Sequence, residues 1–498
     1  MSYRKPIILN TSTSILLQFV IALFGFITPA LIIKQYGSEL NGIVSSINQL
    51  LRYFTLIEAG LGGAAVFYLV RYLSAKDYKN VNIILSYSKK SYIKIGIIFS
   101  TIVLLFTPIY AMLANNQNID KVTIASLFLL FGLTTSIEYF IMSKCRVLLH
   151  ADQKSYYISI FTIISTIVSQ VLTIFLIINN VNILLIYTLS LIINLIRGIS
   201  LNYFVRKHYK DLISFSSIID KKFSLNMQKD VFFHEIFYTI ISALPLLVIT
   251  FIYDFEKVSI YTVYNMPIIM INIILSTIYQ SITATFTHNV NEGNIKKENI
   301  FFKNFYFVYF FFATVMLIST AILLTPFIKI YTFGISDLNY VNPVLGYMLI
   351  MFSLANTFRV IYAIPTASHG LFKETSKIAI MFVFIAIIVS VISGYFLGFE
   401  YALLGPIISF LSNAIYQKNV QNKRVTSFKN SLPILIFLIS FILVTLLYLY
   451  FQINPVIITS WLNFFMLSAL IGTIVSLAFL VFFYFLYVIS KERIFDND

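Results

Sequence analysis

Long apolar stretches recur along the chain and are separated by short polar segments. A helix needs roughly 20 residues to cross about 30 Å of hydrocarbon, and in lipid its backbone hydrogen bonds must close within the segment. The pattern therefore predicts a series of transmembrane helices. The fourteen predicted spans are 13–33, 43–70, 93–113, 122–142, 158–178, 183–204, 231–253, 259–286, 304–325, 344–368, 378–398, 401–417, 432–451 and 462–489. The first span is too long for the apolar region of a signal peptide, so we expect it to remain a membrane helix.

The amino-acid composition also indicates a membrane protein. Of 498 residues, 59% are hydrophobic and only 11% are charged, whereas a soluble protein carries about a quarter charged residues. The single cysteine, Cys145, excludes an internal disulfide. The sequence indicates no metal site and no cofactor, and the lipid bilayer is the expected surrounding of the chain.

The basic residues follow the predicted topology. With the N-terminus in the cytoplasm, 28 of the 35 Lys and Arg residues fall in cytoplasmic segments and four fall outside. The other three, Arg52, Arg197 and Arg359, lie within predicted spans. This bias predicts that both termini are cytoplasmic. It also explains the formal net charge of +15 as a topology signal, so we expect no nucleic-acid partner.

The chain also repeats weakly at an offset of about 220 residues. The second and eighth spans are both long, both rich in polar residues, and both followed by a basic segment. An offset of six helices gives two halves of the same orientation. We therefore predict an all-α integral membrane protein with two six-helix lobes related by a pseudo-twofold axis along the membrane normal. The predicted lobes are residues 1–210 and 211–430, and residues 431–498 add two transmembrane helices and a cytoplasmic tail.

Three predicted helices carry a polar stripe. Because a polar stripe that faces lipid is unfavourable, we expect each one to face the bundle interior or a shared hydrated cavity. Hydrogen bonding between packed helices is the alternative role. The stripes comprise Ser45, Asn48, Gln49, Arg52 and Thr55 in the second span, Tyr261, Tyr264, Asn265, Asn272, Ser276, Tyr279 and Thr283 in the eighth, and Ser353, Asn356 and Arg359 in the tenth.

The arginines are the most informative polar residues, because an arginine at mid-span costs about 2.5–3.5 kcal/mol to insert. Arg52 lies near the predicted midplane, Arg359 lies nearer the cytoplasm, and Arg197 is close enough to the cytoplasmic surface to snorkel. Glu58 lies about 120° around the helix from Arg52, so the two side chains do not meet directly. Glu58 is the best candidate for a carboxylate coupled to an ion or proton, and a structural role is the alternative.

These residue types suit one kind of cargo. Guanidinium groups bind phosphate oxygens through paired N–H donors, amides and hydroxyls bond sugar hydroxyls, and tyrosine rings cover the apolar faces of sugars. The sequence therefore predicts a cavity for a lipid-linked pyrophosphate that carries sugars, and it predicts no catalytic residue. The predicted cavity residues are Arg52, Arg359, Asn48, Gln49, Thr55, Tyr261, Tyr264, Asn265, Asn272 and Asn356, with Arg197 as a secondary cation.

Two stretches resemble a known family. Residues 32–82, IIKQYGSELNGIVSSINQLLRYFTLIEAGLGGAAVFYLVRYLSAKDYKNVN, and the eighth span with YTVYN and THNVNEG are similar to bacterial polysaccharide-biosynthesis flippases of the Wzx type. These belong to the multidrug/oligosaccharidyl-lipid/polysaccharide (MOP) exporter superfamily. The resemblance implies a flippase of the bacterial cell membrane that carries an undecaprenyl-pyrophosphate-linked repeat unit outward by alternating access. It leaves other polysaccharide-assembly proteins open as partners.

The alternatives are another MOP exporter or a membrane enzyme. A flippase for the peptidoglycan precursor would carry a stronger cationic cluster. A cation-coupled drug exporter would carry an acidic residue in the first span, and residues 13–33 have none. A polysaccharide polymerase or glycosyltransferase needs a sizeable loop or catalytic domain and an acidic motif, but the connecting segments here are short. We therefore expect a transporter that is not an enzyme.

Overall fold

The computed structural model describes residues 4–58, 61–114, 119–210, 229–291, 295–424 and 432–495. Within these ranges the secondary structure is helical throughout, which confirms the predicted all-α fold class. Eleven of the described helical stretches are long and apolar enough to span a membrane, and Leu61–Ser74 and Phe237–Ile252 are shorter apolar helices. The chain is a multi-pass membrane protein.

The helices form two compact units. Unit 1 comprises Met1–Ile236 and Asp254–Ser259, and unit 2 comprises Phe237–Tyr253 and Ile260–Asp498. The predicted lobe boundary near residue 210 falls beside residues 211–228, which lie outside the described residues.

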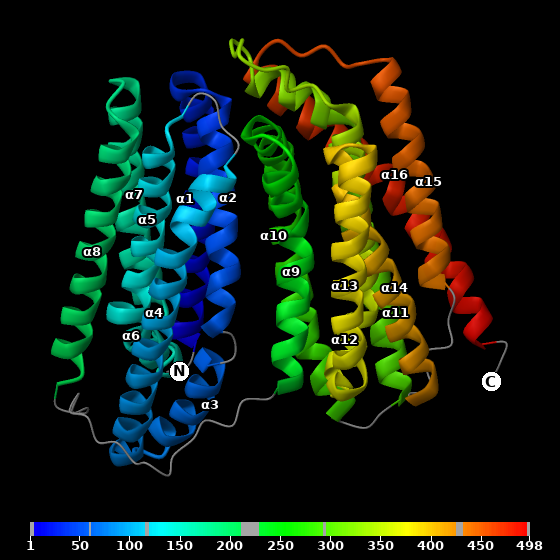
Figure 1. Cartoon of the computed structure of the whole chain (residues 1–498). Helices are drawn as coiled ribbons and strands as arrows, with labels where there is room; N and C mark the ends of the chain where they lie inside the picture. Colours follow the sequence, from blue (N-terminus) through cyan, green and yellow to red (C-terminus); the bar gives the residue numbers. More distant parts are fainter. Residues whose placement is uncertain are drawn as a thin grey trace. The chain divides into compact units, whose positions relative to one another are not determined.

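Unit 1 is a bundle in which α1 packs along α7, α4 along α5, and α8 along both α5 and α7 (Figure 1). Its helices are α1 (Arg4–Tyr36), α2 (Ser38–Phe54), α3 (Leu61–Ser74), α4 (Tyr78–Leu113), α5 (Lys121–Ile137), α6 (Ser143–Ala151), α7 (Tyr156–Ile178) and α8 (Ile183–His208).

Two predicted spans of unit 1 are irregular in the structure. The prediction of one continuous helix over 43–70 is wrong, because α2 ends at Phe54 and a 3-10 turn, Thr55–Glu58, precedes α3. The sequence Ala59-Gly60-Leu61-Gly62-Gly63 follows this turn, and glycine has a low helix propensity. The predicted span 122–142 extends to Ala151, and a π-helical turn, Glu138–Met142, separates α5 from α6.

Unit 2 is a second bundle, in which α12 and α13 both pack on α14, and α11 packs on α12 (Figure 1). The last two helices, α15 and α16, pack on α11 and so belong to this unit. Its helices are α9 (Lys229–Ile252) from Phe237 onward, α10 (Phe255–Asn291) from Ile260 onward, α11 (Ile295–Tyr331), α12 (Pro343–Ser368), α13 (Phe372–Leu397), α14 (Leu404–Arg424), α15 (Leu432–Ile453) and α16 (Trp461–Phe495).

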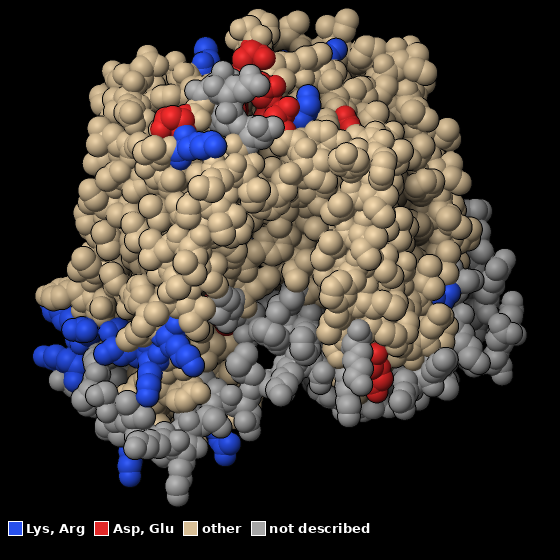
Figure 2. Space-filling model, viewed as in Figure 1, with Lys and Arg blue, Asp and Glu red and all other residues tan. Residues whose placement is uncertain are grey.

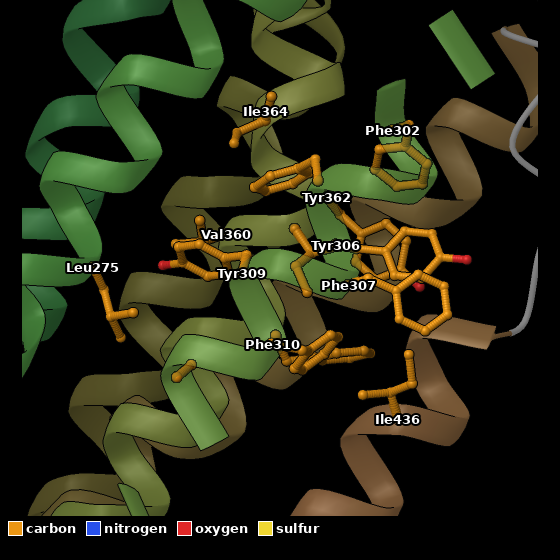
Figure 3. Close-up of a cluster of buried hydrophobic side chains, with 14 of the residues drawn as sticks. Leu275, Phe302, Tyr306, Phe307, Tyr309, Phe310, Val360, Tyr362, Ile364 and Ile436 are labelled. Atoms are coloured by element: carbon orange, nitrogen blue, oxygen red, sulfur yellow. The ribbon is translucent and has the colours of Figure 1, made fainter. Parts of the chain in front are cut away.

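An aromatic cluster forms the core of unit 2 (Figure 3). Side chains of α11, α12 and α15 interlock there, and edge-on ring contacts such as Phe358–Tyr362 add to the burial of apolar area. The described cluster includes Phe302, Phe305, Tyr306, Phe307, Tyr309, Phe310, Phe358, Tyr362 and Ile436.

The first six helices of each unit follow one plan. The helices from α9 to α14 begin about 220 residues after their counterparts in unit 1, counting α2 with α3 and α5 with α6 as single members. In both units the third member packs on the fourth, and the sixth packs on the fourth and the fifth. These shared neighbours support the internal repeat that the sequence predicts.

Charge is distributed unevenly on unit 1. Figure 2 shows basic side chains gathered at the end where α3 meets α4. The opposite end, where α1 meets α2 and α4 meets α5, mixes Lys34 and Lys121 with Glu39 and Asp120. The exposed basic residues of the first end are Arg71, Lys76, Lys79, Lys89, Lys90, Lys94, Arg206, Lys207 and Lys210. We refer to this end as the basic end.

At the basic end, hydrogen bonds tie the helix termini together. Asp77 caps α4 by accepting a hydrogen bond from the backbone N–H of Asn80 at 3.1 Å, and this bond lowers the pKa of the carboxyl group. The Tyr209 hydroxyl donates to Asp152, which also pairs with Lys154 at 2.8 Å. These contacts fasten the end of α8 to the turn between α6 and α7.

The first turn of α10 belongs to unit 1 and packs tightly on α2. A Cβ atom at Gly42 would lie 1.9 Å from the carbonyl oxygen of Phe255. One residue earlier, the Asn41 amide donates a hydrogen bond to the Ser259 hydroxyl at 2.8 Å, and both side chains are buried. Only glycine permits this approach of the two backbones.

Gly42→Ala should lower the stability of the folded protein by about 1–3 kcal/mol, because the added methyl group overpacks a contact with rigid backbone. The measurement is the melting temperature of the purified protein in detergent. Gly25→Ala on α1 is the matched control, because no atom lies within 4 Å of a Cβ built there. Equal melting temperatures for the two variants would contradict the tight α2 contact.

Candidate functional site

In unit 1 the predicted stripe of the second span is an unburied face of α2. Asn48 and Arg52 are exposed, and Ser45, Gln49 and Thr55 are half-buried. The opposite face of the helix is buried and includes Ile43, Ile47, Leu50 and Leu51. The stripe is therefore not consumed by packing within unit 1.

Arg52 is the unpaired cation of this face. Its guanidinium group forms no hydrogen bond or ion pair with any residue in the described part of the chain, whereas Asn48 bonds only the Val44 carbonyl oxygen of its own helix, at 3.0 Å. An unpaired guanidinium group within a membrane segment needs water or an anion as its partner. Because the 3-10 turn begins at Thr55, Arg52 lies in the last turn of α2, where its charge also suits the helix dipole.

Glu58 ends the 3-10 turn and faces tyrosines of its own unit. It is half-buried, and its carboxylate interacts electrostatically with Tyr92 of α4 and Tyr139 of the π-helical turn. The positive charge of Arg146 also interacts electrostatically with the hydroxyl groups of these two tyrosines. The structure thus places Glu58 beside a polar cluster inside unit 1, while a role in ion or proton coupling stays a prediction.

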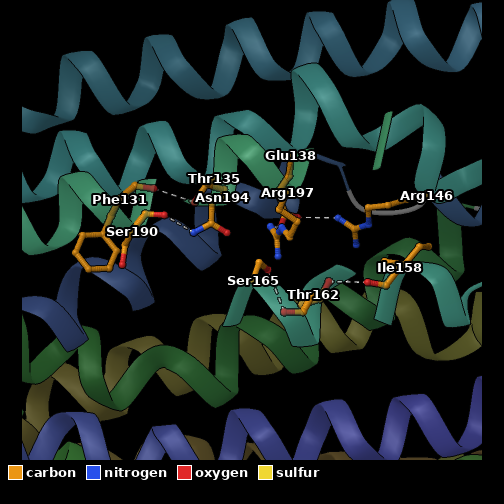
Figure 4. Close-up of polar contacts among 10 residues, drawn as sticks. All are labelled: Phe131, Thr135, Glu138, Arg146, Ile158, Thr162, Ser165, Ser190, Asn194 and Arg197. Carbon is orange, nitrogen blue, oxygen red and sulfur yellow. Dashed lines mark hydrogen bonds and ion pairs between the residues drawn. The ribbon is translucent and has the colours of Figure 1, made fainter. Parts of the chain in front are cut away.

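Arg197 belongs to an ion triad (Figure 4). Its Nη2 lies 3.1 Å from Oε1 of Glu138, and Nη1 of Arg146 lies 2.8 Å from Oε2 of the same carboxylate. The α5–α6 segment thus supplies Glu138 and Arg146, and α8 supplies Arg197. Sequence reasoning did not pair Glu138 with Arg146, because the π-helical turn between them leaves no signal in the apolar pattern.

In unit 2, Arg359 of α12 is held by an amide and two rings. The Asn356 side-chain oxygen accepts hydrogen bonds from Nε at 3.1 Å and from Nη2 at 2.9 Å. The guanidinium carbon lies 5.0 Å from the ring centre of Tyr238 and 5.2 Å from that of Phe410. These cation–π contacts stabilise the charge without neutralising it. No carboxylate of the described residues pairs with Arg359.

The stripe of α12 continues toward α10. The Ser353 hydroxyl donates to the Asn272 side-chain oxygen at 3.2 Å, so part of the stripe does bond between helices. Asn272 and Asn265 are half-buried, and Asn356 is 9% exposed. The structure therefore groups Asn272, Ser353, Asn356 and Arg359 along the α10–α12 contact.

The two predicted tyrosines of α10 lie in the core of unit 2. Tyr264 is fully buried, and its hydroxyl accepts a hydrogen bond from the backbone N–H of Asn342 at 2.7 Å, at the start of α12. Tyr261 is 2% exposed. Asn342-Pro343 is a typical helix start, because an amide side chain caps the helix and proline follows it. The backbone N–H of Asn342 lies outside the helix ladder and needs another acceptor, which Tyr264 supplies. Substrate contact by either tyrosine stays a prediction.

Cysteine labelling should show that the polar face of α2 is wet. In a Cys145→Ala background, which removes the buried native thiol, Asn48→Cys should react with a charged thiol reagent at least about tenfold faster than Leu104→Cys. Leu104 of α4 is 63% exposed but apolar, so we expect it to face lipid, where no thiolate forms. Equal rates at the two positions would mean that the α2 face lies in lipid or in packed protein.

No protein-family model matches the chain, and no curated protein sequence matches it. Many solved structures are similar to the chain, among them a lipid II flippase and two MATE structures. A lipid II flippase, MurJ, in an inward closed conformation has a TM-score of 0.65 and 18% identity, with 95% of this chain and 99% of that chain covered. A multidrug resistance MATE transporter of the MOP superfamily, in an inward-facing conformation, has a TM-score of 0.58 and 13% identity, with 82% and 96% covered. A MATE structure in a bent conformation has a TM-score of 0.55 and 13% identity, with 85% and 96% covered. These similarities show that the chain shares the fold of these transporter structures.

Proposed function

We propose that this protein is a flippase that moves a polyprenyl-pyrophosphate-linked oligosaccharide from the cytoplasmic to the outer leaflet of the cell membrane by alternating access. One observation carries the proposal. Each unit holds an arginine in a predicted membrane span, Arg52 and Arg359, that pairs with no carboxylate of the described residues. A cation held in this way is suited to an anionic cargo that enters from outside the fold.

Arg359 retains the donors that a phosphate group requires. A guanidinium group has five N–H donors, and Asn356 engages Nε and Nη2. The N–H groups at Nη1 remain for phosphate oxygens, which arginine binds in pairs. The rings of Tyr238 and Phe410 hold the planar group in place, so less side-chain freedom is lost when the ligand binds.

The neighbouring polar groups suit sugars. Asn48, Gln49 and Thr55 share the open face of α2 with Arg52, and amides and hydroxyls both donate to and accept from sugar hydroxyls. The polyprenyl tail remains in the bilayer during transfer and needs no polar surface. Separate groups on one face therefore serve the phosphate and the glycan.

The fold comparison favours a lipid cargo over a drug. The lipid II flippase covers 95% of this chain, against 82% for the inward-facing multidrug transporter. Cation-coupled drug exporters often carry an acidic residue in the first helix, and α1 contains neither Asp nor Glu. A flippase for the peptidoglycan precursor shares the pyrophosphate chemistry and is the second candidate, which the choice of sugars in a transport assay separates from the first.

In a transport assay, Arg52→Ala and Arg359→Ala should each slow translocation by about tenfold, the worth of one charge-assisted hydrogen bond of roughly 1.5 kcal/mol. The assay uses the full chain in liposomes and a fluorescent polyprenyl-pyrophosphate oligosaccharide. The control for loss of charge alone is Lys34→Ala, because Lys34 is an exposed basic residue at the end of unit 1 opposite the basic end. Unchanged translocation in both arginine variants would refute the proposed roles.

The double variant Arg52→Ala/Arg359→Ala tests whether both arginines act on the same transfer step. If both hold the headgroup in that step, the rate should fall by less than the product of the two single effects, because contacts to one group are not additive. Translocation rates of all four chains are compared in one lipid mixture. A fall equal to that product would show that the two residues act independently.

A further inference from the structure

The ion triad of unit 1 has no role in the mechanism proposed so far. It consists of Glu138, Arg146 and Arg197, with one carboxylate between two guanidinium groups at 2.8 and 3.1 Å (Figure 4). The side chain of Arg197 is 10% exposed, while those of Glu138 and Arg146 are 38% and 40% exposed. The triad is therefore buried on the Arg197 side and open on the Glu138–Arg146 side.

The triad has more donors than acceptors. Each arginine has five N–H donors and spends one on Glu138 among the described residues. The Nε of Arg197 is buried and has no hydrogen-bond partner in the part of the chain that the structure describes. A buried N–H group without an acceptor is unfavourable, so this geometry points to an additional acceptor from a ligand.

The π-helical turn builds this arrangement. Eight residues along a regular α-helix place two side chains about 80° apart, so Glu138 and Arg146 would diverge. The turn Glu138–Met142 absorbs one residue, which makes the pair equivalent to i and i+7, within about 20° of alignment. Such π-turns are rare in helices and frequent at functional sites.

The triad stands near the basic end of unit 1. Glu58 of the 3-10 turn is a further acidic side chain of this unit, near Tyr92 and Tyr139. Arg197 lies nine residues before Arg206, the first of the basic residues that end α8. That separation is roughly 14 Å along the helix, so the triad lies within reach of a headgroup at the basic end.

We propose that Arg146 and Arg197 form a second anion site, which takes the pyrophosphate of the polyprenyl-linked substrate, and that Glu138 occupies the phosphate position until the substrate displaces it. This role rests on the proposed function and adds a capture step at the basic end. Phosphate oxygens match the paired donors of the two arginines.

The test measures affinity for farnesyl pyrophosphate, a short polyprenyl pyrophosphate, in nanodiscs of zwitterionic lipid. The full chain carries Arg52→Ala and Arg359→Ala, so that those two arginines contribute nothing to the signal. Glu138→Gln should tighten binding by about tenfold, because it removes the competing charge while keeping the shape. Arg146→Gln and Arg197→Gln should each weaken binding by about tenfold, and Arg197→Lys should weaken it less.

The matched control is Arg71→Gln, an exposed basic residue at the same end of unit 1, which should leave the affinity unchanged. Melting temperatures without ligand identify variants that fail to fold, and Glu138→Gln then remains decisive because displacement by the substrate predicts a gain in affinity that misfolding does not produce. A triad with a purely structural role would lose stability in Glu138→Gln without any gain in affinity.

Two controls identify the source of the phosphate group. Inorganic pyrophosphate and phosphatidylglycerol are tested as competitors, and effective competition by either at the concentration of the probe would overturn the assignment to the polyprenyl substrate. Unchanged affinity in Glu138→Gln and Arg146→Gln would overturn the site itself. Translocation that proceeds normally in liposomes while the triad variants bind as before would leave the proposed function intact and remove only this inference.

Discussion

The need to satisfy an arginine inside a bilayer is the constraint on which the rest of this structure depends. A guanidinium group stays charged at any physiological pH, so the protein must supply a counter-charge, a polarisable surface or water. The three arginines within predicted spans show three solutions. Arg197 has a carboxylate, Arg359 has an amide and two aromatic rings, and Arg52 has an open polar helix face. Their availability to an anionic ligand increases in the same order.

Departures from regular helix place this chemistry. The 3-10 turn after Phe54 ends α2 just beyond its polar stripe and places Glu58 beside tyrosines of α4 and of the π-helical turn. The π-helical turn aligns Glu138 with Arg146. Both irregularities lie in unit 1. In unit 2, Arg359 lies on α12, which is α-helical from Pro343 to Ser368. The rings beside Arg359 come from Tyr238 of α9 and Phe410 of α14, which pack against it. Two units with one helix plan thus present cations by different local means.

The fold by itself does not choose a cargo, because the same architecture serves a lipid II flippase and multidrug transporters. The choice lies in the side chains. A helix α1 without acidic residues, an unpaired arginine in each unit, and amides beside Arg52 form a set suited to phosphate and sugar.

The sequence by itself determined the class of the molecule, because hydrophobic length and the position of charge are properties of consecutive residues. Apolar stretches of helical length predicted the spans, and the repeat near 220 residues predicted the shared plan of the two units. The polar stripes on α2 and α12 predicted that Arg52 and Arg359 lie among other polar side chains on one face of each helix. Only the tertiary structure decided which polar groups are spent. The Tyr264 hydroxyl bonds the start of α12, and Arg197 pairs with Glu138. Partners 78 and 59 positions away leave no trace in local periodicity. The breaks after Phe54 and at Glu138 were likewise decided by packing, because an apolar stretch reads the same whether its backbone turns as α, 3-10 or π.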